Sequence, residues 1–263
     1  MKRMGVKKLE IKCNVAIFTM KEEERKDVRK LKERKLQVLL EDNHFFPSFR
    51  ISQEEYVRET VRKKVSKILG TTDFYVEQLY TWADPKYYTK EQNVIVTYLV
   101  VANYHKIQKL EEKYKLYTVT LQEIKKTQIE KLQEVSLWHP EDKICYQILT
   151  RRVQKESNVD YVHSLLGKAN IEELEIVIIH TALKRMRNRI ENTNLAFNFL
   201  NREFTLSELQ QVYEVILDKK LIKANFRKKM EPMVKKTDTI IKESAYRPAQ
   251  KYEFNPEYIE FWV

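Results

Sequence analysis

The sequence predicts a sandwich of the α+β or α/β class in the front part of the chain and a winged helix-turn-helix at its end. The first expectation comes from the order strand, strand, helix, strand, strand between residues 12 and 104. The second comes from two amphipathic helical stretches followed by a hairpin-like stretch beyond residue 200. With 263 residues, the chain has room for one large domain or two ordinary ones.

The chain is strongly basic, with a formal net charge of +11. A protein this basic often meets a polyanion, and nucleic acid is the first candidate. A genome that favours lysine codons would give the same composition, so charge alone does not separate the two explanations.

Composition also excludes several kinds of site. Three glycines are too few for a P-loop or a GxGxxG turn, which excludes Walker-type ATPases and ordinary Rossmann enzymes. Cys13 and Cys145 lie far apart, outside any CxxC pattern, and the five histidines show no metal-ligand spacing, so neither a cofactor nor a metal is predicted. The longest apolar run, Val94–Ala102, is too short to cross a bilayer and no signal peptide is recognised, so a cytoplasmic protein without a membrane partner is expected.

Buried strands alternate with charged segments in the first part of the chain. Residues 12–20 and 36–42 are apolar runs bounded by charge, and both are predicted strands. The mixed charge run between them, residues 21–35, is predicted to be a solvated loop or hairpin tip. Two further strands, 74–82 and 93–104, are separated by an Ala-Asp-Pro turn signal.

One helix is predicted between the second and third of these strands. It begins at Ser52, because Ser52 and Glu55 fit a capping box, and it ends at Gly70, a typical C-cap. Its outward positions carry lysine and arginine, and residues 61–70 contain no carboxylate. Its apolar stripe consists of Val57, Val61, Val65 and Ile68 or Leu69.

The middle of the chain is less regular. Residues 106–138 show no clear period, and no element is predicted there. Residues 143–167 are predicted to form a hairpin, and residues 171–191 one long amphipathic helix whose last turns are strongly basic.

Beyond residue 200 the predicted order is helix, turn, helix, hairpin. Thr205 and Glu208 form a capping box that opens the first helix, and residues 221–233 form the second. The hairpin covers residues 237–254. The apolar positions of the first helix are Leu206, Leu209, Val212, Tyr213 and Ile216. One face of the second helix is predicted to hold Ile222, Phe226, Met230 and Met233, and the other Lys223, Ala224, Arg227 and Lys228.

This order is that of a winged helix-turn-helix, in which the second helix enters the major groove of DNA and the hairpin places a cation near the phosphates. The run Lys219–Lys229 holds six basic residues and no acid. The alternative is a solvated basic helix on a structural domain. The predicted DNA-binding residues are Lys220, Lys223, Asn225, Arg227, Lys228 and Arg247.

The C-terminal motifs resemble those of a known family. FTLSELQQVYEVILDKK followed by NFRKKM, and later YRPAQKYEF, is similar to the winged helix of the Nudix-related, NrtR-like transcriptional regulators. In the front half, LQVLL and FYVEQLYTWADP resemble the strands that flank the Nudix helix. The resemblance implies an α+β fold, a Nudix-like α/β/α sandwich with a mixed sheet. It divides the chain into a degenerate Nudix-like effector-sensing domain at 1–168 and a linker helix with a winged helix-turn-helix at 169–263.

The resemblance also implies that the catalytic carboxylates are lost. Nudix hydrolases hold Mg²⁺ with an Arg-Glu and a Glu-Glu pair just before a terminal glycine. Anchored on Gly70, the Arg-Glu pair becomes Lys63 and Lys64, and the Glu-Glu pair becomes Lys67 and Ile68. A divalent cation needs clustered oxygen ligands, and ammonium groups repel it.

Two further positions of the family's box complete this comparison. The early glycine of the box becomes Phe49, and Glu55 alone survives in its expected place. The chain is therefore predicted to be inactive as a hydrolase.

An inactive box leaves room for a sensor. The resemblance implies that the domain binds an ADP-ribose-like phosphate compound or a sugar. The candidate effector-binding residues are Arg50, Lys64, Trp82, Asp84 and Tyr87. The DNA helix departs from the family pattern at Ile222 and Ala224, where relatives usually have an acid and a base, which leaves the operator sequence open.

The sequence as a whole predicts a cytoplasmic, homodimeric transcriptional regulator that binds an operator in double-stranded DNA and a small-molecule effector. Two alternatives stay open at this point. The first is a Nudix-type hydrolase of a nucleoside diphosphate derivative with non-standard metal ligands. The second is a protein-interaction module that uses the winged helix as a scaffold.

Overall fold

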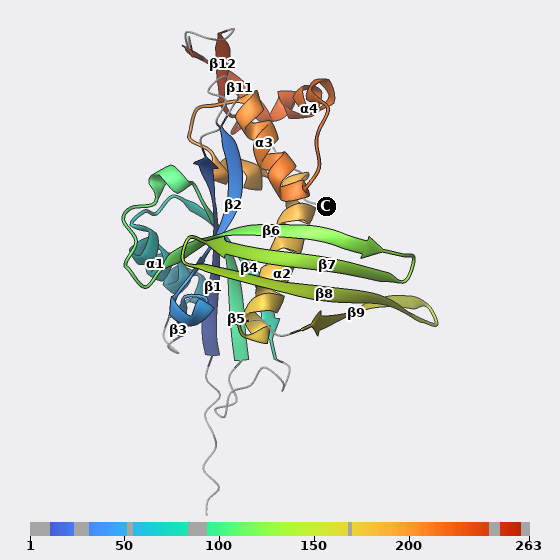
Figure 1. Ribbon diagram of the computed structural model, residues 1–263. Helices are drawn as coiled ribbons and strands as arrows, with labels where there is room; N and C mark the ends of the chain where they lie inside the picture. The colour runs from blue at the N-terminus through green and yellow to red at the C-terminus, as the bar shows by residue number, and fades with distance from the viewer. Residues whose placement is uncertain are drawn as a thin grey trace, which may run out of the picture.

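The computed structural model describes residues 11–23, 32–51, 55–83, 94–167, 170–241 and 248–258. A large mixed sheet forms the front part of the chain, and a small helical domain with a three-stranded sheet stands at one end of it (Figure 1). The helix α2 (Glu173–Ile190) runs along the large sheet and leads into the small domain.

The large sheet has the order β4-β5-β1-β2-β6-β7-β8-β9, with β3 also paired to β1. Only β1 and β5 pair in parallel among the described strands, which makes the sheet mixed as predicted. Strands β6 to β9 are long and cross over α2 in Figure 1. The strands are β1 (Ile11–Glu23), β2 (Glu33–Leu40), β3 (Ser48–Arg50), β4 (Phe74–Trp82), β5 (Val94–Ala102), β6 (Lys115–Lys126), β7 (Glu130–His139), β8 (Asp142–Lys155) and β9 (Asn158–Leu166).

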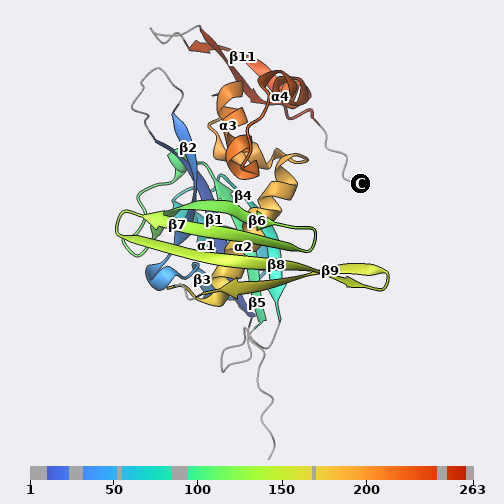
Figure 2. The ribbon, with the colours of Figure 1, turned by 45° about the vertical axis from the view of Figure 1, so that its right-hand side comes forward.

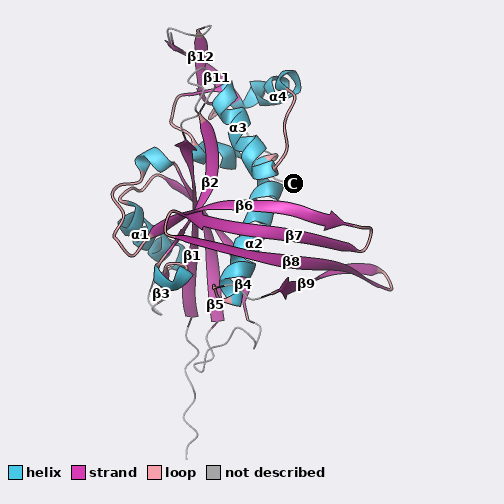
Figure 3. Cartoon of the chain, viewed as in Figure 1, coloured by secondary structure: helices cyan, strands magenta, loops and turns pink. Residues whose placement is uncertain are grey.

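Two helices cover opposite faces of the central strands (Figure 3). The helix α1 (Val57–Leu69) buries Val61, Val65 and Leu69 against one face, which confirms the predicted stripe at these three positions. The other face packs against α2. The predicted C-cap is also confirmed, because Gly70 adopts a left-handed φ of 66° and donates its amide to Ser66. The front part is therefore an α/β/α sandwich.

The small domain has the predicted order of elements (Figure 2). It contains α3 (Leu206–Leu217), α4 (Lys223–Met230) and a three-stranded sheet of order β10-β12-β11. The strands of this sheet are β10 (Phe204–Thr205), β11 (Val234–Ile241) and β12 (Ala249–Phe254). The described residues also form short 3-10 helices at Asp42–His44, Tyr104–Lys106, Asn194–Phe199 and Glu231–Met233. Two helices followed by a hairpin are the elements of a winged helix-turn-helix.

One apolar core joins the two parts. It contains Phe18 and Leu99 of the sheet, Ile179 of α2, and Tyr213 and Phe226 of the small domain. Because these residues belong to one contiguous cluster, the small domain is packed onto the sheet through α2. Within the described residues, none of the helices combines the length and apolarity that crossing a bilayer would need.

The predicted start of α1 is wrong. The helix begins at Val57, with Tyr56 as an N-cap that makes no side-chain capping bond. The Glu55 carboxylate accepts a bond from the Thr60 hydroxyl at 3.0 Å. Ser52 lies outside the described residues.

The structure fills the segment for which no element is predicted. Residues 106–138 contain β6 and most of β7. The outer half of β6 is exposed on both faces, from Gln122 to Lys126, so its sequence lacks the alternation that marks a half-buried strand. The charge run 21–35 is likewise partly strand, since β1 extends to Glu23 and β2 begins at Glu33.

The predicted apolar face of the second helix is confirmed except at one position. Phe226, Met230 and Met233 are buried, whereas Ile222 is 69% exposed. Ile222 precedes the first helical residue, Lys223, and so does not share the helical period. Helix α4 is shorter than the predicted 221–233, because it begins at Lys223 and because Glu231–Met233 form a 3-10 helix.

Candidate functional site

The turn between α3 and α4 is fixed by polar side chains of α3. Asp218 ends α3 with a left-handed φ of 53°. The Glu214 carboxylate accepts the Leu221 amide at 3.0 Å, and the Gln210 amide donates to the Leu221 carbonyl at 2.9 Å. Burial raises the pKa of Glu214, but bonds from the Leu221 amide, Lys220 and Gln210 outweigh it and hold this pKa below its ordinary value. The carboxylate therefore stays ionised and holds the start of α4 in place.

The inner face of α4 packs against α3. Phe226 and Met230 are buried, and the Phe226 ring meets Tyr213 edge-on with centroids 5.2 Å apart. This packing leaves the opposite face of α4 pointing to solvent. The exposed residues on this outer face are Lys223, Ala224, Asn225, Arg227 and Lys228.

The basic residues of this region fall into two groups. Lys220 pairs with Glu214 at 2.9 Å, and Lys229 pairs with Glu191 at 3.5 Å. Within the described part of the chain, no carboxylate lies within ion-pair distance of Lys223, Arg227 or Lys228. Their positive charge is available to an anion that approaches α4 from outside.

The structure places five of the six predicted DNA-binding residues on this surface. Lys220 lies in the turn before α4, and Lys223, Asn225, Arg227 and Lys228 lie on α4 itself. Arg247 lies outside the described residues. The hairpin of β11 and β12 stands beside α4 and carries the exposed Lys236.

The predicted effector residues lie on two faces of the large sheet. Arg50 of β3 is in register with Lys12, Lys12 with Ile95, and Ile95 with Trp82. Residues in register point to the same face, so Arg50 and Trp82 both lie on the face covered by α2. Trp82 is buried and its indole N–H donates to the Thr97 hydroxyl at 2.9 Å.

Lys64 lies on the other face. It is exposed on α1, with its ammonium 5.9 Å from the centroid of the Phe49 ring. Lys63 and Lys67 are exposed on the same helix. Asp84 and Tyr87 lie outside the described residues. No group of three or more His, Cys, Asp or Glu side chains in the described ranges is placed to hold a metal ion.

Two adjoining cavities of about 900 and 500 Å³ lie between α2 and residues of β4 and of β6 to β9. They share Tyr161, His163 and His180, so they form one groove, which we call the α2 groove. One end is lined by Tyr80 and Trp82 of β4. The other end is lined by Lys126, Lys131, Arg152, Lys184 and Arg187.

The sequence did not predict that residues of α2 line a groove. They recur at helical spacing along the edge of its apolar stripe, which was the available signal. They are Glu173, Val177, His180, Thr181, Lys184, Arg187 and Asn188.

Two histidines lie where the cavities meet. The rings of His163 and His180 are 5.3 Å apart in an edge-on contact. Burial, then the neighbouring His163 and Lys184, lowers the pKa of His180 to about 4. Burial and Lys184 also hold the pKa of His163 below its ordinary value. Both rings are therefore neutral near pH 7, and the positive charge in the groove comes from lysine and arginine.

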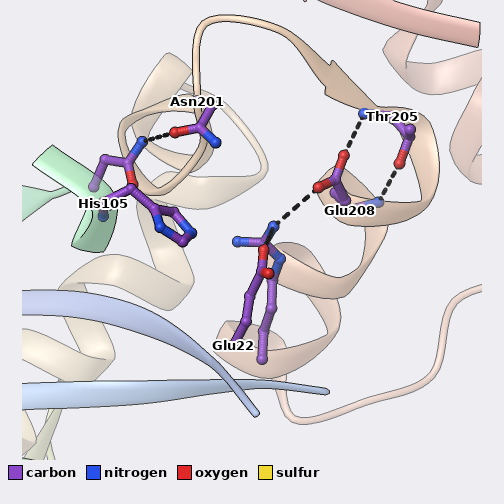
Figure 4. Close-up of polar contacts among 7 residues, drawn as sticks. Glu22, His105, Asn201, Thr205 and Glu208 are labelled. Atoms are coloured by element: carbon purple, nitrogen blue, oxygen red, sulfur yellow. Dashed lines mark hydrogen bonds and ion pairs between the residues drawn. The ribbon is translucent and has the colours of Figure 1, made fainter. Parts of the chain in front are cut away.

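Polar contacts connect the large sheet to the small domain (Figure 4). Arg34 of β2 binds Glu22 of β1 at 2.5 Å and Glu208 of α3 at 3.3 Å. Glu208 also completes the predicted capping box with Thr205, which is confirmed. After β5, the Asn103 amide donates to the Asn201 side chain at 2.8 Å. A third contact with the small domain comes from α2, where Arg187 donates to the Ile216 carbonyl of α3 at 2.9 Å.

Comparison with known proteins agrees with this architecture. The family model of the NrtR DNA-binding winged helix domain matches residues 196–254. The ADPR responsive transcriptional repressor NtrR of Acinetobacter baylyi is 38% identical over 79 residues, which are 29% of this chain. That match spans only 31% of the length of the curated relative.

Two solved structures share the fold over 94% of the chain. One is a MutT/nudix family protein from Enterococcus faecalis, with a TM-score of 0.64, 17% identity and 88% of its own chain covered. The other is Shewanella oneidensis NrtR complexed with a 27mer DNA, with a TM-score of 0.63, 19% identity and 94% of its chain covered. The predicted resemblance to NrtR-like proteins and the predicted fold class are therefore confirmed.

Proposed function

We propose that this chain, built like the NrtR-type proteins, is a transcriptional regulator that binds operator DNA through α4. The observation that carries the proposal is the outer face of α4, where Lys223, Arg227 and Lys228 are exposed without a carboxylate partner among the described residues. This face belongs to the segment that matches a DNA-binding winged helix. In this arrangement the side chains of the second helix reach base edges and phosphates in the major groove.

The proposed DNA-binding set is the predicted one: Lys220, Lys223, Asn225, Arg227, Lys228 and Arg247. Within it, Asn225 is suited to read a base edge, because a side-chain amide can both donate and accept. Lys220 has the weakest claim to a phosphate, because it already pairs with Glu214. We propose a homodimer, in which two copies of α4 meet the two halves of a palindromic operator, and we place it in the cytoplasm.

The front domain, residues 1–168 in our division, is proposed to sense a small molecule without hydrolysing it. The relative from Acinetobacter baylyi is named for its response to ADPR, which favours an ADP-ribose-like effector. The side chains at the family's metal-binding positions, Lys64, Lys67 and Ile68, do not suit a divalent cation, because two are ammonium groups and one is a hydrocarbon. Glu55 is bonded to Thr60.

A hydrolase is the second candidate, since the fold is shared with a MutT/nudix family protein. Incubation with ADP-ribose and Mg²⁺, followed by chromatography, tests it. We expect no AMP above a protein-free control. Robust, protein-dependent AMP release would replace the regulator by a hydrolase.

Fluorescence anisotropy of DNA from upstream of the protein's own gene tests the main proposal. Binding is expected at low salt, and it should weaken steeply as salt rises. Each lost phosphate contact lowers the slope of log K against log[salt] by about 0.9. The variant Arg227→Ala should show this loss, whereas Lys143→Ala, an exposed lysine on β8 of the large sheet, should not. Absence of a complex at low salt, together with an unaltered Arg227→Ala, would favour the protein-interaction module instead.

A further inference from the structure

The α2 groove has the dimensions of a ligand site. Its two adjoining cavities, of about 900 and 500 Å³, fall within the range of small-molecule pockets, which is roughly 300–1,000 Å³. The groove is partly open, since Tyr161 and Lys184 are exposed while His180 is buried. A ligand could therefore enter from the side of β9 and rest on the histidine pair.

The cationic end of the groove is only partly neutralised. Glu130 lines it but pairs with Arg151 at 2.8 Å. Lys131 pairs with Glu123, but no carboxylate of the described residues pairs with Lys126, Arg152 or Lys184. The Lys184 ammonium lies 5.8 Å from the Tyr161 ring centroid and repels a proton from both groove histidines. Several cations that converge without a carboxylate partner attract an anion with several acceptor oxygens, such as a phosphate.

The opposite end of the groove is aromatic. Tyr80 and Trp82 have ring centroids 4.6 Å apart, and Tyr80 is 53% exposed. An exposed ring beside a buried one offers a stacking surface to a flat group. From these two ends we infer that the α2 groove binds a nucleotide-type ligand, with its phosphates beside Lys184 and Arg152 and its ring towards Tyr80.

Arg187 connects this groove to the DNA-binding helix. It lines the cationic end, and the same guanidinium donates to the Ile216 carbonyl at 2.9 Å and lies 4.0 Å from Asp218. Asp218 ends α3 and starts the turn into α4. A phosphate in the groove competes with this carbonyl and carboxylate for Arg187, because a charged acceptor makes the stronger bond. Ligand binding would then loosen the turn that positions α4.

This inference rests on the proposed sensor function for its biological meaning, but its test does not need DNA. Calorimetric titration of the full chain with ADP, ADP-ribose, pyrophosphate and adenosine measures binding. ADP or ADP-ribose should bind, and adenosine, which lacks phosphate, should bind at least about tenfold more weakly. Lys184→Glu should weaken the phosphorylated probes at least about tenfold, since it puts a like charge beside them.

Lys143→Glu is the matched control, because Lys143 is an exposed lysine on β8 that lines neither cavity. It should leave the affinity unchanged within about twofold, and circular dichroism should show both variants folded. The inference is overturned if none of the phosphorylated probes binds, or if Lys184→Glu weakens their binding no more than Lys143→Glu does.

Amide hydrogen exchange tests whether Arg187 couples ligand binding in the groove to the turn before α4. In the wild type, saturating ADP-ribose or ADP should speed exchange of the amides of residues 217–221, and Arg187→Met should lose this response. A bound ligand that leaves exchange there unchanged would refute the role of Arg187. If these results are obtained but the protein binds no operator, the proposed regulatory function is refuted, whereas the proposed ligand site is supported.

Discussion

Arg34 links the large sheet to α3, and its replacement by methionine should destabilise the junction between them. Its side chain is 5% exposed, and its two partners, Glu22 and Glu208, are 22% and 26% exposed. Removing one member of a fully buried ion pair costs about 3–5 kcal/mol, because a charge is left without a partner. Here both carboxylates keep about a quarter of their surface in water, so we expect a smaller loss of about 2–3 kcal/mol.

Urea unfolding followed by circular dichroism measures this loss. Lys35→Met is the matched control, because Lys35 is the next residue on β2 and pairs with Glu23 at 2.5 Å, yet both side chains are near 40% exposed. An exposed pair contributes about 0–1 kcal/mol, so Lys35→Met should change little. Equal losses in the two variants would refute the view that burial makes Arg34 a structural link. A cycle with Glu208→Gln separates its bond to α3 from its bond to Glu22.

Three further predictions concern stability. Thr205→Ala removes half of the capping box and should cost about 1 kcal/mol in urea unfolding. Gly70→Ala should cost at least about 1–2 kcal/mol by the same measurement, because φ is +66° and the new Cβ would lie 2.5 Å from Oε1 of the Gln108 side chain. Stability should fall as pH drops from 6.5 towards 4 by up to about 3 kcal/mol through His180, because its pKa is about 4 when folded and the unfolded chain takes up the proton first.

The contrary results are equally definite. An unchanged Thr205→Ala would mean that α3 is held by packing alone, and a Gly70→Ala as stable as the wild type would mean that the turn can relax. The contribution of His180 is measured as the unfolding free energy of the wild type minus that of His180→Gln at each pH. This subtraction is needed because Glu175 acts in the opposite direction. Burial raises the pKa of Glu175 to about 7, so its contribution to stability is lost as pH rises from 4.5 through 7. If the difference in unfolding free energy between the wild type and His180→Gln does not change with pH, His180 does not cause the pH effect.

The two capping boxes show how far local sequence determines structure. Ser52 with Glu55 and Thr205 with Glu208 have the same spacing, yet α1 begins only at Val57, whereas α3 begins at its predicted capping box. Thr205 is also fixed by pairing with Lys251, and Glu208 is held by Arg34. Around Glu55 the described contacts include only the Thr60 hydroxyl. The two local sequence patterns are equivalent, and we infer that tertiary contacts explain why a helix begins only at the second of them.

The α2 groove was missed for a different reason. Its lining comes from β4, from β6 to β9 and from α2, which are separated by up to about a hundred residues, and they contribute polar residues that look solvated in isolation. The outer face of α4 was predicted because one short helix carries all of it. A surface formed by one helix can be predicted from the periodicity of its sequence. A groove between several elements can be predicted only when the order of the strands in the sheet is known.

The placement of α2 has a consequence for how the two domains can communicate. One side of this helix lines the groove with His180 and Lys184, while Met186 and Ile190 lie in the core shared with α3. Close-packed cores resist gradual deformation, so a shift of α2 at the groove must be matched by a shift at α3. Arg187 and Arg34 then tie α3 to α2 and to β2, so that α4 is positioned by both elements at once. A ligand that acts on α2 alone therefore has to work against the contact at Arg34, and weakening that contact should enlarge the response of the residue 217–221 turn to ligand.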